Sequence, residues 1–199
     1  MGDSYTIGEA VDIGERWPVR LVRSLRAMGI SLDDPIIIAK TGWTTDELAA
    51  AIDAAAPVGP FDLVSLLIGV NNQYRGRSAD EYRRELTSLL GRAVQLADGR
   101  PEHVLVLSIP DWGVTPFAAR DPRGPIAIGA EIDVYNAVNR DEAHRSGVRY
   151  VDVTPVSRRA GHDGSLIASD GLHPSGLMYA LWTALLLPEA AAVLSRSGM

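Results

Sequence analysis

Four short, almost uninterrupted apolar runs constrain the fold of this chain most strongly. They recur along the sequence with longer helical segments between them. Such runs are typical of parallel strands covered on both faces, because a strand with one face in water alternates apolar and polar residues. The runs are Pro35–Ala39, Asp62–Gly69, His103–Ile109 and Val148–Val153. The pattern predicts an α/β fold, a three-layer α/β/α sandwich around a central parallel sheet.

The segments between the runs carry local helix signals. Thr44 with Glu47, and Ser78 with Glu81, have the spacing of a capping box. The predicted helices are Trp17–Met28, Leu48–Ala56 after the Thr44 cap, one opened by Ser78, Glu131–Arg145 ended by Gly147, and Pro174–Leu194 interrupted near Pro188.

Two long irregular stretches each follow a predicted strand. They are Pro110–Ile126 and Thr154–Leu172. Loops of this length in a compact domain are usually functional, and α/β folds bind ligands where strands end. We therefore expect both stretches to contribute to a site.

Length and composition narrow the class of protein. The 199 residues are expected to form one domain, residues 1–199, and the absence of cysteine excludes a disulfide scaffold and a thiolate zinc site. The net charge of −6 argues against a nucleic-acid partner. The apolar runs look shorter than the ~18 residues of a membrane span, and no signal peptide is recognisable. We expect no membrane span, a cytoplasmic location by default, and no cofactor; no pattern specifies an oligomeric state.

A nucleophile, a base and an orienting acid are available. A serine hydroxyl needs an imidazole to take its proton, and the imidazole needs a carboxylate to fix its tautomer. Ser4 lies in Gly2-Asp3-Ser4, and Asp170 lies three residues before His173, so one turn can bring that pair together. The other candidates, which we consider weaker, are His103, His144, His162 with Asp163, and Asp111.

Donors for an oxyanion hole follow two of the predicted strands. Gly42 offers an unobstructed backbone N–H, and Asn71 offers a side-chain amide. Asn72 could equally cap the turn in which both asparagines lie, so the residues alone leave the choice open.

In chain order, Gly2-Asp3-Ser4, Gly42, Gly69-x-Asn71 and Asp170-x-x-His173 resemble the four blocks of the SGNH (GDSL-type) hydrolase family. The resemblance spans residues 2–175. It implies a flavodoxin-like sheet of order 2-1-3-4-5 with the site at the carboxyl ends of the strands. It also implies Ser4 as nucleophile, His173 as general base and Asp170 as its orienter. The N–H groups of Ser4 and Gly42 and the Asn71 amide would form the oxyanion hole, and Tyr5 replaces the family's Leu.

One departure from the family concerns the first strand. Family members carry a strand immediately before Gly-Asp-Ser, whereas only Met1 precedes Gly2 here. We expect a truncated first strand and a natural start several residues earlier. Neighbouring backbone groups would then lack partners, at roughly 1–3 kcal/mol each.

The resulting functional prediction is a serine esterase for short- or medium-chain carboxylic esters. Its partner would be a small-molecule ester, and no metal is expected. The alternatives are a carbohydrate O-deacetylase, a lysophospholipase or thioesterase, and an inactive binding module. An α/β-hydrolase elbow is excluded because Thr6 stands where its second glycine belongs. The candidate substrate-binding residues are Trp43, Tyr74 and Trp112, with Phe117 nearby, and Trp43 and Trp112 could stack on a sugar.

Overall fold

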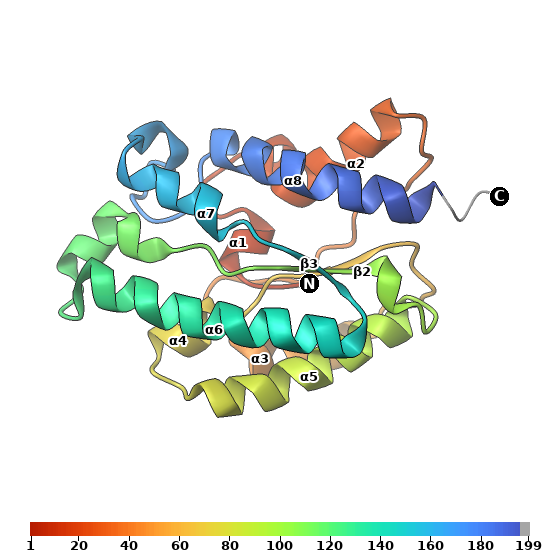
Figure 1. The fold of residues 1–199 in the computed structure, drawn as a ribbon. Coiled ribbons are helices and arrows are strands. Elements are labelled where there is room, and N and C mark those ends of the chain that lie inside the picture. Colours follow the sequence, from red (N-terminus) through yellow and green to blue (C-terminus); the bar gives the residue numbers. More distant parts are fainter. Residues whose placement is uncertain (196–199) are drawn as a thin grey trace.

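A parallel sheet lies between two layers of helices in the computed structural model, which describes residues 1–195 (Figure 1). One face of the sheet is covered by α2 (Trp17–Ala27), α7 (Thr154–Ser157) and α8 (Gly176–Leu194). The other face is covered by α3 (Thr45–Ala55), α5 (Ala79–Leu96) and α6 (Gly124–Ser146). The predicted three-layer α/β/α architecture is confirmed.

Five chain segments lie side by side in the sheet. Three are strands in the parallel order β1 (Val64–Leu66), β2 (Val104–Leu107) and β3 (Arg149–Val151). On the free side of β1, Gly2 forms parallel bridges to both Leu67 and Ala39. Numbered by position in the chain, the segments therefore have the order 2-1-3-4-5, as the resemblance implied.

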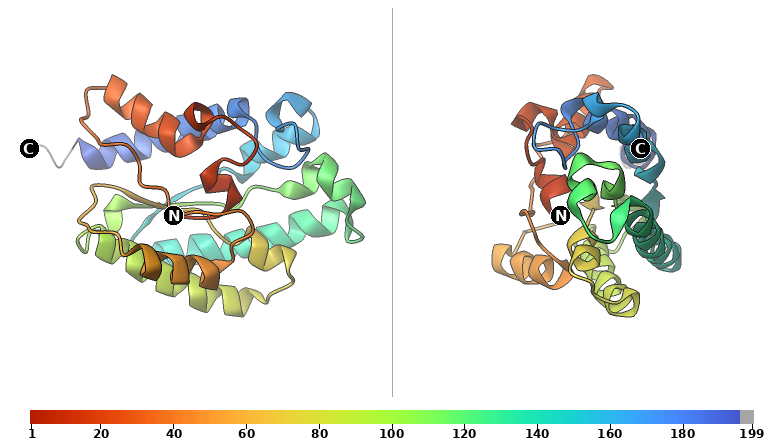
Figure 2. Two further views of the ribbon diagram at one scale, coloured as in Figure 1. Left: turned by 180° about the vertical axis from the view of Figure 1, so that it is seen from behind. Right: turned by 90° about the vertical axis from the view of Figure 1, so that its left-hand side faces the viewer.

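The first strand is reduced to Met1 and Gly2. The Met1 amino group donates to the Ser65 carbonyl at 2.8 Å, and Leu67 N–H donates to the Met1 carbonyl at 3.1 Å. On the side away from β1, Gly2 N–H donates to the Ile38 carbonyl at 3.0 Å. Figure 2 shows the N-terminus in the middle of the molecule, between the helical layers. The hydrogen-bond ladder of this segment runs from Met1 to Gly2.

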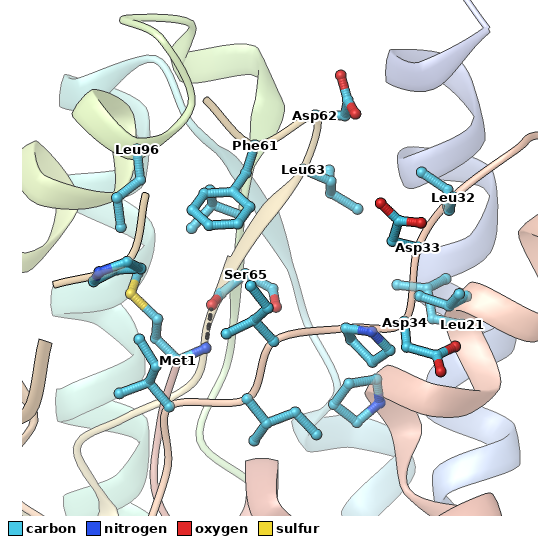
Figure 3. Close-up of a pocket in the computed structure, with 18 of the residues that line it drawn as sticks. Met1, Leu21, Leu32, Asp33, Asp34, Phe61, Asp62, Leu63, Ser65 and Leu96 are labelled. Carbon is cyan, nitrogen blue, oxygen red and sulfur yellow. Dashed lines mark hydrogen bonds between the residues drawn. The ribbon is translucent and has the colours of Figure 1, made fainter. Parts of the chain in front are cut away.

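The prediction that residues 35–39 form a buried strand was wrong. Only Ala39 makes a bridge, and the Ile36 side chain is 66% exposed. An extended segment needs a neighbour to form a ladder, and here the neighbour ends at Met1. The result is a groove of about 420 Å³ beyond Met1, bordered by residues 32–38 and 57–65 (Figure 3).

The predicted helix starts agree well with the structure. Thr44 and Glu47 form the complete capping box of α3, and the Ser78 hydroxyl accepts Glu81 N–H at 3.2 Å. Gly147 ends α6 with a φ of +69°.

Two of the helix predictions need correction. α6 begins at Gly124 rather than Glu131, because Pro125 fits the first turn of a helix, where its missing N–H costs nothing. α8 runs through Pro188 without interruption. Pro188 and Ala184, whose carbonyl loses its partner, are both exposed, so water can satisfy that carbonyl.

Helix α8 is, by length and composition, apolar enough to cross a membrane. Its mean hydropathy is 1.7, so the estimate of short apolar runs was wrong for this segment. Half of the segment is buried inside the protein, where α8 packs on α2, and a core helix has the same composition. The largest fully buried side chains of the molecule include Trp182 on α8 and Trp17 on α2.

Short helical turns follow the strand ends and were not predicted. α1 (Ser4–Ile7) follows Gly2, and α4 (Val70–Tyr74) follows β1. The 3-10 turns are Ile13–Glu15, Pro101–His103, Trp112–Val114, Pro116–Arg120, Arg158–Gly161 and Gly164–Leu166. The last four of these turns lie in the two irregular stretches. Together with α1 and α4, these four turns follow the strands toward the candidate residues.

Candidate active site

Ser4 is placed by the tight turn that joins the first strand to α1. A Cβ on Gly2 would lie 2.2 Å from Thr6 Oγ1 and 2.3 Å from the Leu67 carbonyl, so only glycine fits between the strand and the helix. Asp3 caps α1, since its Oδ1 accepts Tyr5 N–H at 3.0 Å. The first two residues of the Gly-Asp-Ser block therefore shape the turn that presents the third.

The Ser4 side chain has free hydrogen-bonding capacity. Ser4 is buried, with 6% of its surface exposed. Its hydroxyl and its backbone N–H make no hydrogen bond to any residue of the described range 1–195, although its carbonyl accepts Gly8 N–H at 3.0 Å. An oxyanion donor needs a free N–H before substrate arrives.

Asp170 and His173 form a close pair within one turn. His173 Nδ1 lies 2.6 Å from Asp170 Oδ2. Asp170 Oδ1 accepts the backbone N–H groups of Leu172 and His173 at 2.9 and 3.0 Å. Burial opposes ionisation, but these hydrogen bonds outweigh it and lower the pKa of Asp170. An ionised Asp170 holds the proton on Nδ1, which leaves Nε2 to act as a base.

His173 lies against the helix that carries Ser4. The rings of Tyr5 and His173 meet edge to face, with centroids 5.6 Å apart. No hydrogen bond joins Ser4 to His173 within residues 1–195. Catalytic hydrogen bonds are often long in the absence of substrate, so this geometry is compatible with proton transfer once substrate binds.

Asn71 is the asparagine with a donor to spare. Its Nδ2 donates one hydrogen to the Trp43 carbonyl at 2.9 Å, which leaves the second hydrogen free. Asn72 is fully buried and both ends of its amide are engaged: Oδ1 accepts Thr45 N–H at 3.1 Å, and Nδ2 donates to Thr45 Oγ1 at 2.6 Å. Asn72 therefore fastens α4 to α3, while Asn71 keeps one amide hydrogen unused among the described residues.

Gly42, the second predicted oxyanion donor, lies in a tight turn. Its φ is +86°, in the left-handed region, and its N–H makes no hydrogen bond within the part of the chain that the structure describes. The Gly42 carbonyl accepts Arg75 Nη2 at 2.7 Å. Arg75 was not singled out from the sequence, where a lone surface arginine gives no signal.

The competing histidines and acids are exposed or have other partners. His103 Nδ1 is 2.7 Å from the Asp62 carbonyl, and both His144 and His162 are exposed. Asp111 caps a 3-10 turn through Gly113 N–H and pairs with Arg158 at 2.9 Å. Within residues 1–195, no group of three acidic or histidine side chains is arranged to hold a metal ion.

The predicted substrate-binding aromatic residues do not all lie together. Tyr74, Trp112 and Phe117 form a cluster with centroid separations of 5.6 to 6.5 Å. Tyr74 and Phe117 are 49% and 40% exposed, whereas Trp112 is 2% exposed and donates to Gln73. Trp43 is partly buried against the core. Trp112 is too buried to serve as a stacking platform, so the exposed faces of the cluster are those of Tyr74 and Phe117.

A buried carboxyl group beside Ser4 was not predicted from the sequence. Asp3 is fully buried, and its Oδ2 has no hydrogen-bond partner within the described residues. Burial raises the pKa of Asp3 to about 7. Burial also lowers the pKa of the Met1 amino group to about 5. Only the tertiary structure reveals these two groups, because burial cannot be read from a local pattern.

Comparisons with known proteins identify the family and the fold of the chain. The model of the GDSL-like lipase/acylhydrolase family matches residues 1–181. Comparison with curated protein sequences gave no match.

Three similar solved structures illustrate the shared fold. A lipase/acylhydrolase from Enterococcus faecalis is 20% identical, with a TM-score of 0.72 over 96% of this chain and 93% of that one. TesA is 20% identical, with a TM-score of 0.71 and 96% of both chains covered. A variant of Axe2, an acetyl xylan esterase from Geobacillus stearothermophilus, is 21% identical, with a TM-score of 0.70 over 95% of this chain and 91% of that one.

Proposed function

The chain belongs to the GDSL-like lipase/acylhydrolase family, and on that premise we propose that it cleaves short- or medium-chain carboxylic esters through an acyl-enzyme on Ser4. Family membership makes it a carboxylic ester hydrolase. The observation that carries the proposed mechanism is the Asp170–His173 pair at 2.6 Å, which commits Nδ1 and leaves Nε2 as the base.

The proposed reaction has two halves. His173 Nε2 takes the Ser4 proton as Ser4 Oγ attacks the ester carbonyl carbon. The oxygen of the tetrahedral intermediate is held by the N–H groups of Ser4 and Gly42 and by the Asn71 amide. His173 then gives its proton to the leaving alcohol as the acyl–oxygen bond breaks. Water attacks the acyl-enzyme by the same route and releases the acid.

A small cavity lies beside His173. It has a volume of about 20 Å³, and its apolar lining includes Trp112, Leu166 and Met178. Ser4, Gly42 and Asn71 do not line it, so the acyl chain length is left to the substrate panel below.

A carbohydrate O-deacetylase is the second candidate. The exposed rings of Tyr74 and Phe117 offer apolar faces on which a sugar could stack, and the solved structures of similar fold include an acetyl xylan esterase. Rates on acetylated sugars and on simple alkyl acetates, compared at equal concentration, distinguish the two candidates.

Hydrolysis of p-nitrophenyl acetate, butyrate and octanoate tests the proposal. We expect short- or medium-chain esters of this panel to be hydrolysed, and Ser4→Ala to lower kcat/KM by on the order of 10⁴-fold or more, because the nucleophile is lost. Ser88→Ala, an exposed serine on α5, is the matched control and should retain full activity. A folded protein that is inert toward the whole panel would favour the binding module instead.

A further inference from the structure

The Gly42 turn is fastened to α4 by two side chains of that one helical segment. Asn71 Nδ2 donates to the Trp43 carbonyl at 2.9 Å, and Arg75 Nη2 donates to the Gly42 carbonyl at 2.7 Å. Asn71 lies in α4 and Arg75 caps its carboxyl end. Residues four apart share one side of a helix, so the segment presents both donors to two consecutive carbonyls.

The direction of the Gly42 N–H depends on the conformation of this turn. Trp43 N–H closes the turn on the Lys40 carbonyl, at the long distance of 3.3 Å. The Gly42 φ of +86° matches the third residue of a type II turn. In the alternative type I turn the peptide unit before Gly42 is rotated by about half a turn, so its N–H points the opposite way. A weakly closed turn therefore needs another restraint to hold its donor in place.

Arg75 has the contacts to supply that restraint. Besides the Gly42 carbonyl, its guanidinium lies 3.4 Å from Glu47 Oε2. Glu47 in turn accepts Thr44 N–H at 2.8 Å in the capping box of α3. The arginine thus links the turn to the ends of two helices. Space does not restrict the turn, since the nearest atom to a Cβ at Gly42 would be Arg75 Nη2 itself, at 4.0 Å.

We propose that Arg75 is a positioning residue of the oxyanion hole, which fixes the Gly42 turn so that its N–H points at the developing oxyanion. The proposal rests on the proposed function for its catalytic consequence. Its structural part, restraint of the Gly42 turn, stands apart from activity. Preorganised donors speed a reaction because they need not reorient in the transition state, whereas substrate binding in the ground state gains little from them.

Kinetics of matched arginine variants test the catalytic part. We expect Arg75→Met to lower kcat about tenfold on p-nitrophenyl acetate, with KM and the melting temperature nearly unchanged. Arg75→Lys, which keeps a cationic donor group but not the planar fork of the guanidinium, should recover part of the loss. Arg84→Met removes an exposed arginine from α5 and should have no effect. Glu47→Gln keeps a capping acceptor but removes the ion pair, and should cost less than Arg75→Met.

Two further measurements separate positioning from other roles. Added guanidinium ion should partly restore kcat in Arg75→Ala and leave Arg84→Ala unchanged. NMR relaxation of the Gly42 amide should show greater mobility in Arg75→Met than in the unaltered protein. An equal kcat in Arg75→Met and Arg84→Met, or a rise in KM alone, would overturn the proposal. Unchanged mobility of the Gly42 amide in Arg75→Met would also overturn it. That measurement does not depend on activity, so it can be read even if the protein hydrolyses no ester of the panel.

Discussion

The two ends of the Met1–Ser4 segment differ in how completely their surroundings are paired. At the Ser4 end, side chains of Asp3, Asn71 and Arg75 complete the turns around the site. At the Met1 end the ladder stops, and the groove of about 420 Å³ is bordered by extended backbone (Figure 3). Both ends belong to the same short segment in the middle of the sheet.

The open end has a definable shortage of hydrogen bonds. In an extended strand the N–H and C=O of one residue point to the same side. Ser65 and Ile38 use their carbonyls toward Met1 and Gly2, so their N–H groups also face the groove. Ile38 N–H forms no hydrogen bond within residues 1–195. The difference teaches that the site can be well ordered while the sheet below it is incomplete, and it predicts that activity and stability can be changed separately.

Filling the groove should have the largest effect, and that effect should be on stability. An apolar extension such as Arg-Val-Val-Leu-Val ahead of Met1 would continue the ladder between the two borders. We expect stabilisation of about 3–6 kcal/mol, from new hydrogen bonds and apolar burial, and a melting temperature higher by on the order of 10 °C. Hydrogen exchange at the Ser65 and Ile38 amides should slow.

The control for this experiment is an extension of the same length with proline at its second and fourth positions. It also moves the terminal amino group out of the protein, but proline cannot donate to a ladder. Equal stabilisation by both extensions would mean that removal of the buried terminus, and not strand pairing, is responsible.

Asn71→Ala should lower activity at the Ser4 end of the segment. We expect kcat to fall by roughly 10²–10³-fold, the usual loss for one oxyanion donor, with a stability cost of only about 1 kcal/mol for the bond to Trp43. Asn72→Ala is the matched control, because it should lower stability by about 1–3 kcal/mol and affect kcat less. If both variants lose kcat equally, Asn71 is not a donor to the oxyanion.

Asp3 lies between Met1 and Ser4. Its ionisation should change the free energy of unfolding by less than filling the groove does. Its pKa is raised to about 7 by burial, so the folded state holds the proton more tightly than the unfolded chain, where the pKa is 3.8. The stabilisation that the folded state gains by keeping Asp3 protonated is therefore lost as pH rises from 3.8 toward 7. Asn cannot ionise and keeps the oxygen that caps Tyr5.

We accordingly expect Asp3→Asn to gain stability relative to the unaltered protein as pH rises. The gain between pH 5 and pH 7 should be about 2–3 kcal/mol, since each pKa unit is worth ~1.4 kcal/mol. Urea unfolding of both proteins at the two pH values measures it. The Met1 amino group, whose lowered pKa of about 5 acts in the opposite sense, is present in both proteins. A difference that is independent of pH would contradict the raised pKa.

The sequence by itself determined the features that depend on neighbours in the chain. The caps at Thr44 and Ser78 specify where α3 and α5 begin, because a side chain satisfies backbone groups within one turn. Uninterrupted apolar runs located three of the five sheet segments, and the order of the short motifs indicated the family. The Asp170–His173 pair also lies within a single turn.

Tertiary structure alone decided what depends on partners that are distant in the chain. Residues 35–39 have the composition of a strand, but a ladder requires a neighbour, and the neighbour ends at Met1. Which asparagine keeps a free donor depends on Thr45 and Trp43, 27 and 28 residues away. The link from Arg75 to Gly42 spans 33 residues. Hydrogen bonds and burial at such separations arise only when the chain has folded, so no local pattern encodes them.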